Sequence, residues 1–122
     1  MVVPENVCIL FPNLGKFGLG EKRMRIISKK KITEFCKRYP EAEKPLMEWY
    51  RKTKAANWQN ISDVKATFPH ADAVGKCTVF NASGNKYRVI TWVVFEYYTV
   101  YIRHILTHKE YDMEGWKSDC KK

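Results

Sequence analysis

The chain has 122 residues, of which 45% are hydrophobic and 29% charged, so its length and composition suit one globular domain rather than two. Its 22 lysines and arginines against 13 aspartates and glutamates leave a net charge of +9, which favours an anionic partner, nucleic acid ahead of an acidic protein or a lipid surface. No stretch approaches the ~20 consecutive apolar residues of a membrane span, so we expect no membrane partner.

Residues 1–23 differ in composition from the rest of the chain. They hold two of the five prolines and three of the six glycines and show no sustained hydrophobic period, whereas regular patterning begins at Met24. We therefore expect an N-terminal extension over 1–23, which is either an upstream in-frame addition before a natural start at Met24 or a loosely packed arm. Residues 24–122 are expected to form a single domain.

Two amphipathic helices are predicted to follow a short apolar strand at residues 24–27. The first begins after Ser28, a plausible N-cap, and ends at Pro40, and the second begins near Ala42. Both carry one apolar stripe at helical spacing, so we expect them to pack as a hairpin against a sheet, and a one-turn helix should follow at 62–67. The stripe residues are Ile32, Phe35, Cys36 and Tyr39 in the first helix and Leu46, Trp49, Tyr50 and Thr53 in the second.

The last third of the chain has the composition of β-strands. Strands are predicted at 77–81, 86–95 and 99–107, which are rich in β-branched and aromatic residues and are separated by turn residues. Lys86 and Arg88 share one face of the second strand, because side chains alternate along a strand. The order of elements predicts an α+β domain: an antiparallel sheet meander with an N-terminal helical hairpin packed on one face and the other face free for a partner.

The cysteines do not indicate a metal site. Cys8, Cys36, Cys77 and Cys120 lie far apart without a C-x-x-C pair, and no secretory signal precedes them. We therefore expect four reduced thiols in a cytoplasmic protein. The chain also lacks a phosphate-binding loop, a nucleophile elbow and a carboxylate cluster suited to two metals, so no metal and no cofactor is expected.

Arg88 and His108 are the first candidates for chemistry. An arginine inside a strand is costly unless its guanidinium reaches water or an anion, and its fork suits a phosphate; the alternative is an ion pair with a nearby carboxylate. His108 follows the end of the last strand, where it could transfer protons near neutral pH or merely be exposed.

Tyr111 and Lys109 extend this cluster. Tyr111 shares a helical face with His108 if residues 107–112 form a turn, and its phenol could exchange a proton; alternatively its ring caps the core. Lys109 could lower the charge of a phosphate, whereas Glu110 and Asp112 are expected to orient their neighbours.

The other two histidines are interpreted differently. His104 lies within the last strand, with Val100, Ile102 and Leu106 as same-face neighbours, and we interpret it as structural. His70, next to Pro69 in a loop, is considered incidental.

These side-chain types meet the requirements of RNA cleavage without a metal. The ribose 2′-hydroxyl must lose a proton, the leaving oxygen must gain one, and the phosphorane needs a cation. The basic segment 28–54 carries nine lysines and arginines against four glutamates and is either a solvated helical face or an RNA-binding surface; we favour the second. The cations expected to bind RNA are Lys29, Lys30, Lys31, Lys37, Arg38, Arg51, Lys52, Lys54 and Lys86.

The motifs of this chain are similar to those of one known family. Tyr39-Pro40-Glu41-Ala42, Gly84-Asn85-Lys86-Tyr87-Arg88 and Thr107-His108-Lys109-Glu110-Tyr111-Asp112 follow in the order found in HigB toxins. Residues 24–112 therefore resemble the HigB family, within the RelE/ParE-like superfamily of type II toxin–antitoxin systems. Ala82-Ser83 stands where the family usually has Ile-Gly.

The resemblance implies a RelE-like fold and a metal-independent, ribosome-dependent endoribonuclease, an mRNA interferase. Its partners would be a HigA-type helix-turn-helix antitoxin, mRNA and the ribosomal RNA of the A site. By position, Arg88 would stabilise phosphate charge, and His108 and Tyr111 would lie where the family places its acid and base groups; Lys109 and Lys86 are further candidates. The alternatives are a catalytically degenerate module that only binds antitoxin or RNA, indicated by Ala82-Ser83, and topoisomerase inhibition of the ParE type.

Overall fold

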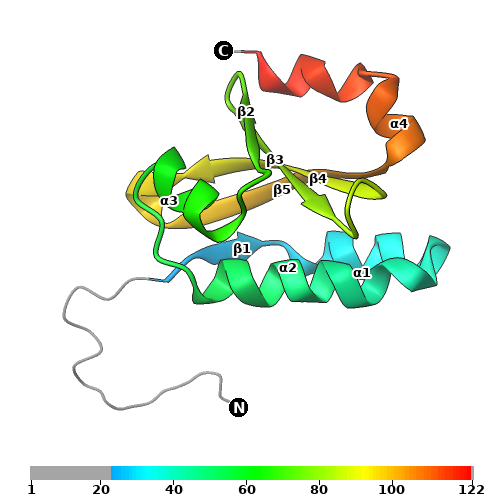
Figure 1. Ribbon diagram of the computed structural model, residues 1–122, viewed down its shortest axis with the longest axis horizontal. Helices are drawn as coiled ribbons and strands as arrows, with labels where there is room; N and C mark the ends of the chain where they lie inside the picture. Colours follow the sequence, from blue (N-terminus) through cyan, green and yellow to red (C-terminus); the bar gives the residue numbers. More distant parts are fainter. Residues whose placement is uncertain (1–22, 122) are drawn as a thin grey trace.

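The computed structural model describes residues 23–121, so the predicted N-terminal extension lies outside the described residues except for Arg23. A central sheet separates a helical layer on one side from the C-terminal segment on the other (Figure 1). The helices are α1 (Lys29–Arg38), α2 (Glu43–Ala55), α3 (Ile61–Thr67) and α4 (His108–Asp112), and the strands are β1 (Arg25–Ile27), β2 (Asp72–Val74), β3 (Cys77–Ala82), β4 (Tyr87–Val94) and β5 (Thr99–Thr107).

The sheet has the strand order β1-β5-β4-β3-β2. Strands β3, β4 and β5 form the predicted antiparallel meander, which β2 extends, and the α+β class is confirmed. Strand β1 adds a parallel edge to β5, with Ile26 paired to Val100, which the order of elements did not predict. Strand β2 was also not predicted, because three residues are too few to display an alternating pattern.

The helical hairpin covers one face of the sheet, as the two apolar stripes predicted. Ser28 lies at the N-cap of α1 but makes no side-chain capping bond, so burial of Ile32 and Phe35 holds this helix in place. Phe80 of β3 lies at the centre of this core and is fully buried. Its ring centroid is 5.4 Å from that of Trp49, 5.8 Å from that of Trp58 and 5.2 Å from that of Phe68.

The opposite face of the sheet is not entirely free, contrary to prediction. Residues Gly115–Cys120 form a 3₁₀ helix, here named the C-terminal strap, that packs on it (Figure 1). Trp116 and Cys120 of the strap are buried in a second core cluster with Cys77, Val79 and Ile90.

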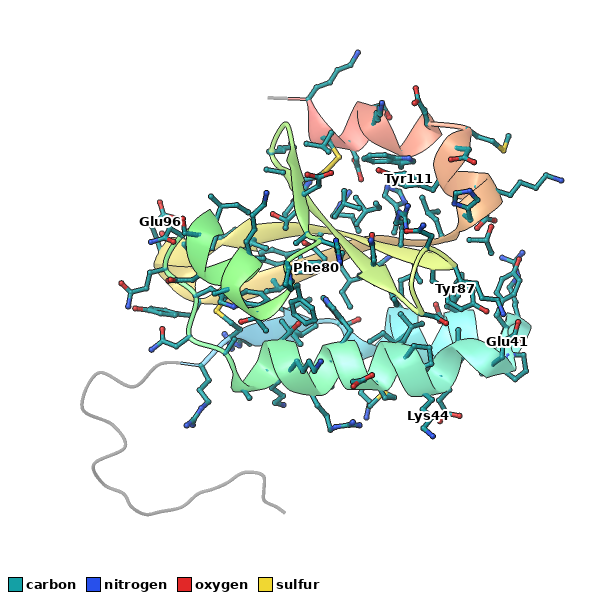
Figure 2. The ribbon with its side chains drawn as sticks, in the orientation of Figure 1. Glu41, Lys44, Phe80, Tyr87, Glu96 and Tyr111 are labelled. Carbon is teal, nitrogen blue, oxygen red and sulfur yellow. A yellow bond between two sulfur atoms is a disulfide. The ribbon has the colours of Figure 1, made fainter. Side chains whose placement is uncertain are left out.

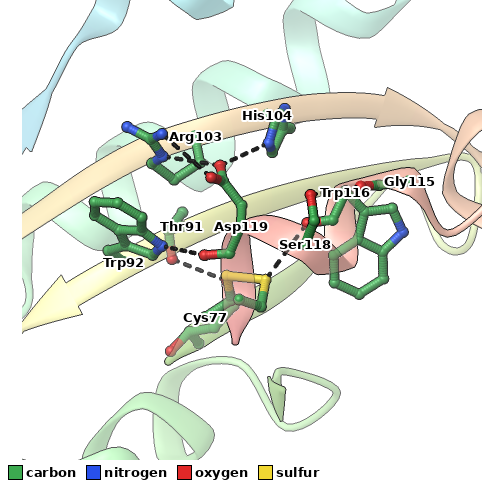
Figure 3. The surroundings of a disulfide bond; sticks show 11 residues. Cys77, Thr91, Trp92, Arg103, His104, Gly115, Trp116, Ser118 and Asp119 are labelled. Atoms are coloured by element: carbon green, nitrogen blue, oxygen red, sulfur yellow. Dashed lines mark hydrogen bonds and ion pairs between the residues drawn. A yellow bond between two sulfur atoms is a disulfide. The ribbon is translucent and has the colours of Figure 1, made fainter. Parts of the chain in front are cut away.

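A disulfide between Cys77 and Cys120 joins the strap to β3 (Figure 3). The prediction of four reduced thiols is therefore wrong for this pair, whereas Cys36 is free and Cys8 lies outside the described residues. The two cysteines are 43 residues apart, so their proximity depends on the folding of the strap onto the sheet and leaves no sequence signal. The backbone N–H of Lys76 also donates to the carbonyl of Cys120, at 2.9 Å.

Reduction of this disulfide is expected to lower the free energy of unfolding by about 2–4 kcal/mol, because the cross-link restricts the unfolded chain. Urea unfolding of the oxidised protein and of the protein in dithiothreitol measures the difference. The double variant Cys77→Ser/Cys120→Ser is the control, and its midpoint should not respond to dithiothreitol. Equal midpoints for oxidised and reduced wild-type protein would contradict the expectation.

A β-bulge in the β4–β5 pairing changes which way the side chains of β5 point. Ile90 pairs with His104 but Thr91 pairs with Ile102, so Arg103 is the extra residue. Val100 and Ile102 pack into the core beneath the helices, whereas Leu106, two residues beyond His104, packs with the strap cluster. The predicted shared face of His104 with Val100 and Ile102 is therefore wrong, because the bulge reverses the alternation.

Candidate functional site

Arg88 lies near the start of β4, and the residue before it fixes the position of this strand. Tyr87 is buried beneath the helices, and its hydroxyl donates to Glu41 Oε2 at 3.1 Å (Figure 2). Burial, followed by the bond to Glu41, raises the pKa of Tyr87, so the phenol keeps its proton and this bond. Because side chains alternate, Arg88 points away from the helical hairpin.

The turn that leads into Arg88 has two consecutive left-handed residues, Ser83 with φ of 57° and Gly84 with φ of 64°. The left-handed backbone conformation costs little free energy for glycine and more for serine. This gives a physical reason for glycine at position 83, the second residue of the Ile-Gly pair expected from the resemblance. The turn nevertheless closes with Ser83, since its carbonyl accepts the N–H of Lys86 at 3.1 Å. The turn before Arg88 therefore forms with Ala82-Ser83 in place of Ile-Gly.

Helix α4 begins at His108, so the condition for His108 and Tyr111 to share a helical face is met. The hydroxyl of Thr107 accepts the N–H of Glu110 at 3.3 Å, and the carboxylate of Glu110 accepts the N–H of Thr107 at 2.9 Å. This capping box confirms that Glu110 orients its neighbours. His108 Nε2 lies 3.3 Å from Asp112 Oδ2, so Asp112 can hold the imidazole in one orientation.

Two further contacts connect α4 to the start of β4. The N–H of His108 donates to the carbonyl of Lys86 at 3.0 Å. The guanidinium carbon of Arg88 lies 4.6 Å from the ring centroid of Tyr111, and this ring stacks on Trp116 with centroids 4.9 Å apart. The structure thus brings Arg88 and Tyr111 together and places His108 at the first position of the same short helix.

Sequence reasoning missed two residues that touch this cluster. Asn85 Oδ1 accepts a bond from Arg88 at 3.4 Å, and Trp116 supports the ring of Tyr111. Within residues 23–121, Arg88 forms no ion pair, so the carboxylate alternative finds no support there. Trp116 follows Tyr111 by five residues in a stretch without a clear hydrophobic period. The sequence therefore offers no indication that the two rings are in contact.

The two candidate lysines take different positions. Lys86 belongs to the turn, and its ammonium lies 5.8 Å from the ring centroid of Tyr87. It also helps to lower the pKa of Glu41, after the bonds that this carboxylate accepts from its own backbone and from Tyr87. The prediction that Lys86 points the same way as Arg88 is therefore wrong. Lys109 is exposed on α4.

The cations of the basic segment are all exposed, but they do not gather in one patch. Lys30 pairs with Glu34 at 3.9 Å, and Lys52 pairs with Glu48 at 3.8 Å, both along exposed helix faces. Six others divide among three shallow grooves. Lys29 and Lys37 lie between α1 and α2, Lys31 and Arg38 between α1 and β5, and Arg51 and Lys54 beside Met24.

A second polar cluster lies on the face that the strap covers (Figure 3). Asp119 Oδ2 accepts a bond from Arg103 Nε at 3.1 Å and lies 2.9 Å from His104 Nε2, while Asp119 Oδ1 lies 3.4 Å from the terminal nitrogen of Arg103. The bond from Arg103, followed by the one from His104, holds the pKa of Asp119 below its ordinary value. His104 therefore has a structural partner, as its interpretation as structural required.

The stabilisation by Asp119 is expected to depend on pH in the acid range. A carboxyl whose pKa is lowered by folding stabilises the protein above its unfolded-state pKa, here about 3.8, and this contribution is lost as the pH falls through the lower folded-state value. The free energies of unfolding of wild-type protein and Asp119→Asn should therefore converge in strong acid. Urea titrations from about pH 7 to about pH 2 measure this difference, and a constant difference over the whole range would contradict the expectation.

Neither a metal-binding cluster nor a membrane-spanning helix is found in the described part of the chain. Between residues 23 and 121, no group of three His, Cys, Asp or Glu side chains is arranged to hold a metal ion. None of the helices in this range has the length and hydrophobicity needed to cross a lipid bilayer.

A known protein family matches this chain over the region that contains Arg88, His108 and Tyr111. The HigB toxin family model, described as the RelE-like toxic component of a toxin-antitoxin system, matches residues 42–114. The mRNA interferase toxin HigB of Escherichia coli (strain K12) is 34% identical over 92 residues, which cover 73% of this chain and 88% of that protein. The mRNA interferase HigB of Shigella flexneri gives the same values. The mRNA interferase HigB of Escherichia coli O6:H1 is 32% identical over 73% of this chain and 89% of that protein. The chain therefore belongs to the HigB family of RelE-like toxins from toxin–antitoxin systems.

Proposed function

We propose that this protein is an mRNA interferase, an endoribonuclease that cleaves mRNA without a metal on the translating ribosome. The observation that supports it most directly is the contact of Arg88 with Tyr111 on the helix that His108 begins. The relatives from Escherichia coli and Shigella flexneri are named mRNA interferases, and the match to them covers most of both chains.

The side chains divide the chemistry among them. Arg88 presents a guanidinium whose fork can bind two phosphate oxygens and stabilise the phosphorane formed when the 2′-hydroxyl attacks. His108, oriented by Asp112, transfers a proton between the reacting oxygens and the solvent. Tyr111 holds the guanidinium of Arg88 by its ring, and its hydroxyl is available for a proton transfer. Lys109, exposed on the same helix, adds positive charge next to the reacting phosphate.

The partners follow from charge and family. The exposed cations of α1 and α2, together with Lys86, would contact ribosomal RNA around the A site, because phosphate contacts position a protein without reading sequence. A HigA-type helix-turn-helix antitoxin would bind the toxin and repress the shared operon. A substrate on ribosomes places the protein in the cytoplasm.

The catalytically degenerate alternative depended on the Ala82-Ser83 sequence before Arg88. Ser83 adopts the left-handed backbone that glycine would take, and the turn delivers Arg88 to Tyr111. This geometry favours an active enzyme over a module that only binds antitoxin or RNA.

A reconstituted translation reaction tests the proposal. Purified toxin is added to a defined mRNA with and without ribosomes, and primer extension maps new 5′ ends. We expect codon-positioned stops that appear only when ribosomes translate the message. Intact mRNA in the translating reaction would overturn the enzymatic proposal and favour the binding module, and equal cleavage of free mRNA would overturn ribosome dependence alone.

A further inference from the structure

The bulge in β5 brings two consecutive side chains, Arg103 and His104, to one carboxylate. In a regular strand, Arg103 and His104 would point to opposite faces, but as the extra residue Arg103 can reach the same group as His104. That group is Asp119 of the C-terminal strap (Figure 3). The segment that the HigB family model matches ends at residue 114, so Asp119 lies outside it.

The donors around Asp119 have the geometry of an oxyanion site. Arg103 addresses both carboxylate oxygens, at 3.1 Å from Nε and 3.4 Å from a terminal nitrogen, and His104 Nε2 lies 2.9 Å from one of them. A guanidinium fork with a third donor suits the two non-bridging oxygens of a phosphodiester equally well. Trp92 fixes the plane of the guanidinium, whose central carbon lies 4.0 Å from its ring centroid.

The cluster is accessible to solvent, and the Asp119 carboxylate in it can be displaced. The side chains of Arg103, His104 and Asp119 are 38%, 37% and 28% exposed. Because water screens an ion pair at this depth, its contribution to stability is modest, and a competing anion can replace the carboxylate. The Asp119 carboxylate then stands where a ligand phosphate would bind.

The groove next to this cluster contains two further cations, Lys31 and Arg38. A groove of about 420 Å³ between α1 and β5 is lined by Arg103 and His104 on one wall and by Lys31 and Arg38 on the other. Its one carboxylate, Glu34, pairs with Lys30 at 3.9 Å. The apolar side chains of Phe35, Ile105 and Leu106 complete the lining and offer surface for ribose or base.

We propose that Arg103 and His104 form a phosphate-binding subsite for the RNA substrate, and that Asp119 occupies it as an intramolecular substitute for the phosphodiester. The identity of the anion as RNA rests on the proposed function. His104 pairs with Ile90 and Leu106 pairs with Arg88, so the subsite lies on the same sheet face as Arg88, on the neighbouring strand. RNA that passes Arg88 would meet this subsite and then the groove beside α1.

Binding of a non-cleavable, fully 2′-O-methylated RNA oligonucleotide tests the subsite by fluorescence anisotropy. Asp119→Asn should bind this oligonucleotide about threefold to fivefold more tightly, and the slope of log K against log salt should steepen by about 0.7, the value for one added phosphate contact. The matched control is Glu114→Gln, which removes the same charge from an exposed carboxylate that pairs with Lys117 at 3.1 Å. Adding Arg103→Gln to Asp119→Asn should abolish the gain.

A tightening no larger than that of Glu114→Gln, or one that survives Arg103→Gln, would overturn the subsite. If Asp119→Asn perturbs the strap, seen in the near-ultraviolet circular dichroism of Trp116, wild-type protein and Arg103→Gln decide instead. The subsite then requires weaker RNA binding and a shallower salt slope for Arg103→Gln, and unchanged binding would reject it. This readout is independent of cleavage, so an inactive protein that shows the gain would contradict the proposed function and leave the subsite supported.

Discussion

Arg88→Ala is expected to reduce mRNA cleavage in the translation reaction by about 10²–10³, because the phosphorane loses its cationic donor. The fold should persist, since Arg88 is only partly buried and its contacts are with Asn85 and the ring of Tyr111. His108→Ala should have an effect of about 10²–10⁴, the range for loss of a general acid or base. Single-turnover rates on translating ribosomes measure both.

Arg25→Ala is the matched control, because it removes an exposed arginine from β1, at the far edge of the sheet from the β3–β4 turn. Two substitutions of Tyr111 separate its roles. Tyr111→Phe keeps the ring beneath Arg88 and should retain activity if the ring positions the guanidinium, whereas Tyr111→Ala should lose it. A protein that cleaves normally with alanine at 88 and 108 would rule out this assignment of the site.

Phe80→Ala is expected to lower the free energy of unfolding by about 3–5 kcal/mol, the range for truncation of a fully buried aromatic residue. Its ring is packed against Trp49 of α2, Trp58 of the connection between α2 and α3, and Phe68, which directly follows α3. Phe80 lies between the helices and the sheet (Figure 2). These large rings cannot all collapse into the vacated volume, so truncation should leave a cavity there. Urea unfolding followed by tryptophan fluorescence measures the loss.

Tyr97→Ala serves as the comparison for Phe80→Ala. Tyr97 is 77% exposed in the turn before β5, so its truncation should change the free energy of unfolding by less than about 0.5 kcal/mol. Similar losses for the two variants would indicate that Phe80 is not the centre of the core.

Local periodicity was sufficient to predict the helices and the long strands. The stripe that contains Ile32 and Phe35 identified α1, and the alternating run at 99–107 identified β5 with the bounds that the structure has. The shared face of His108 and Tyr111 required a helical turn over residues 107–112, and the capping box of Thr107 and Glu110 stabilises this turn. In each case the signal depends on residues within a few positions of one another.

The remaining features depend on contacts between distant segments. Cys77 contacts Cys120 only because the strap packs on the sheet, and the same packing places Asp119 next to Arg103. The bulge opposite Ile90 moves His104 to the other face, although the sequence of β5 alternates without interruption. An alternating pattern fixes the faces of a regular strand but cannot show where one residue is inserted.

The chemistry of the cleaved ends tests the central claim most directly. If His108 and Arg88 promote attack by the 2′-hydroxyl, mass spectrometry of mRNA fragments from the translation reaction will find a 2′,3′-cyclic phosphate upstream and a 5′-hydroxyl downstream of each cut. Fragments that carry a 5′-phosphate and a 3′-hydroxyl would show that water attacks instead. That result would contradict the mechanism even if the toxin cleaves mRNA.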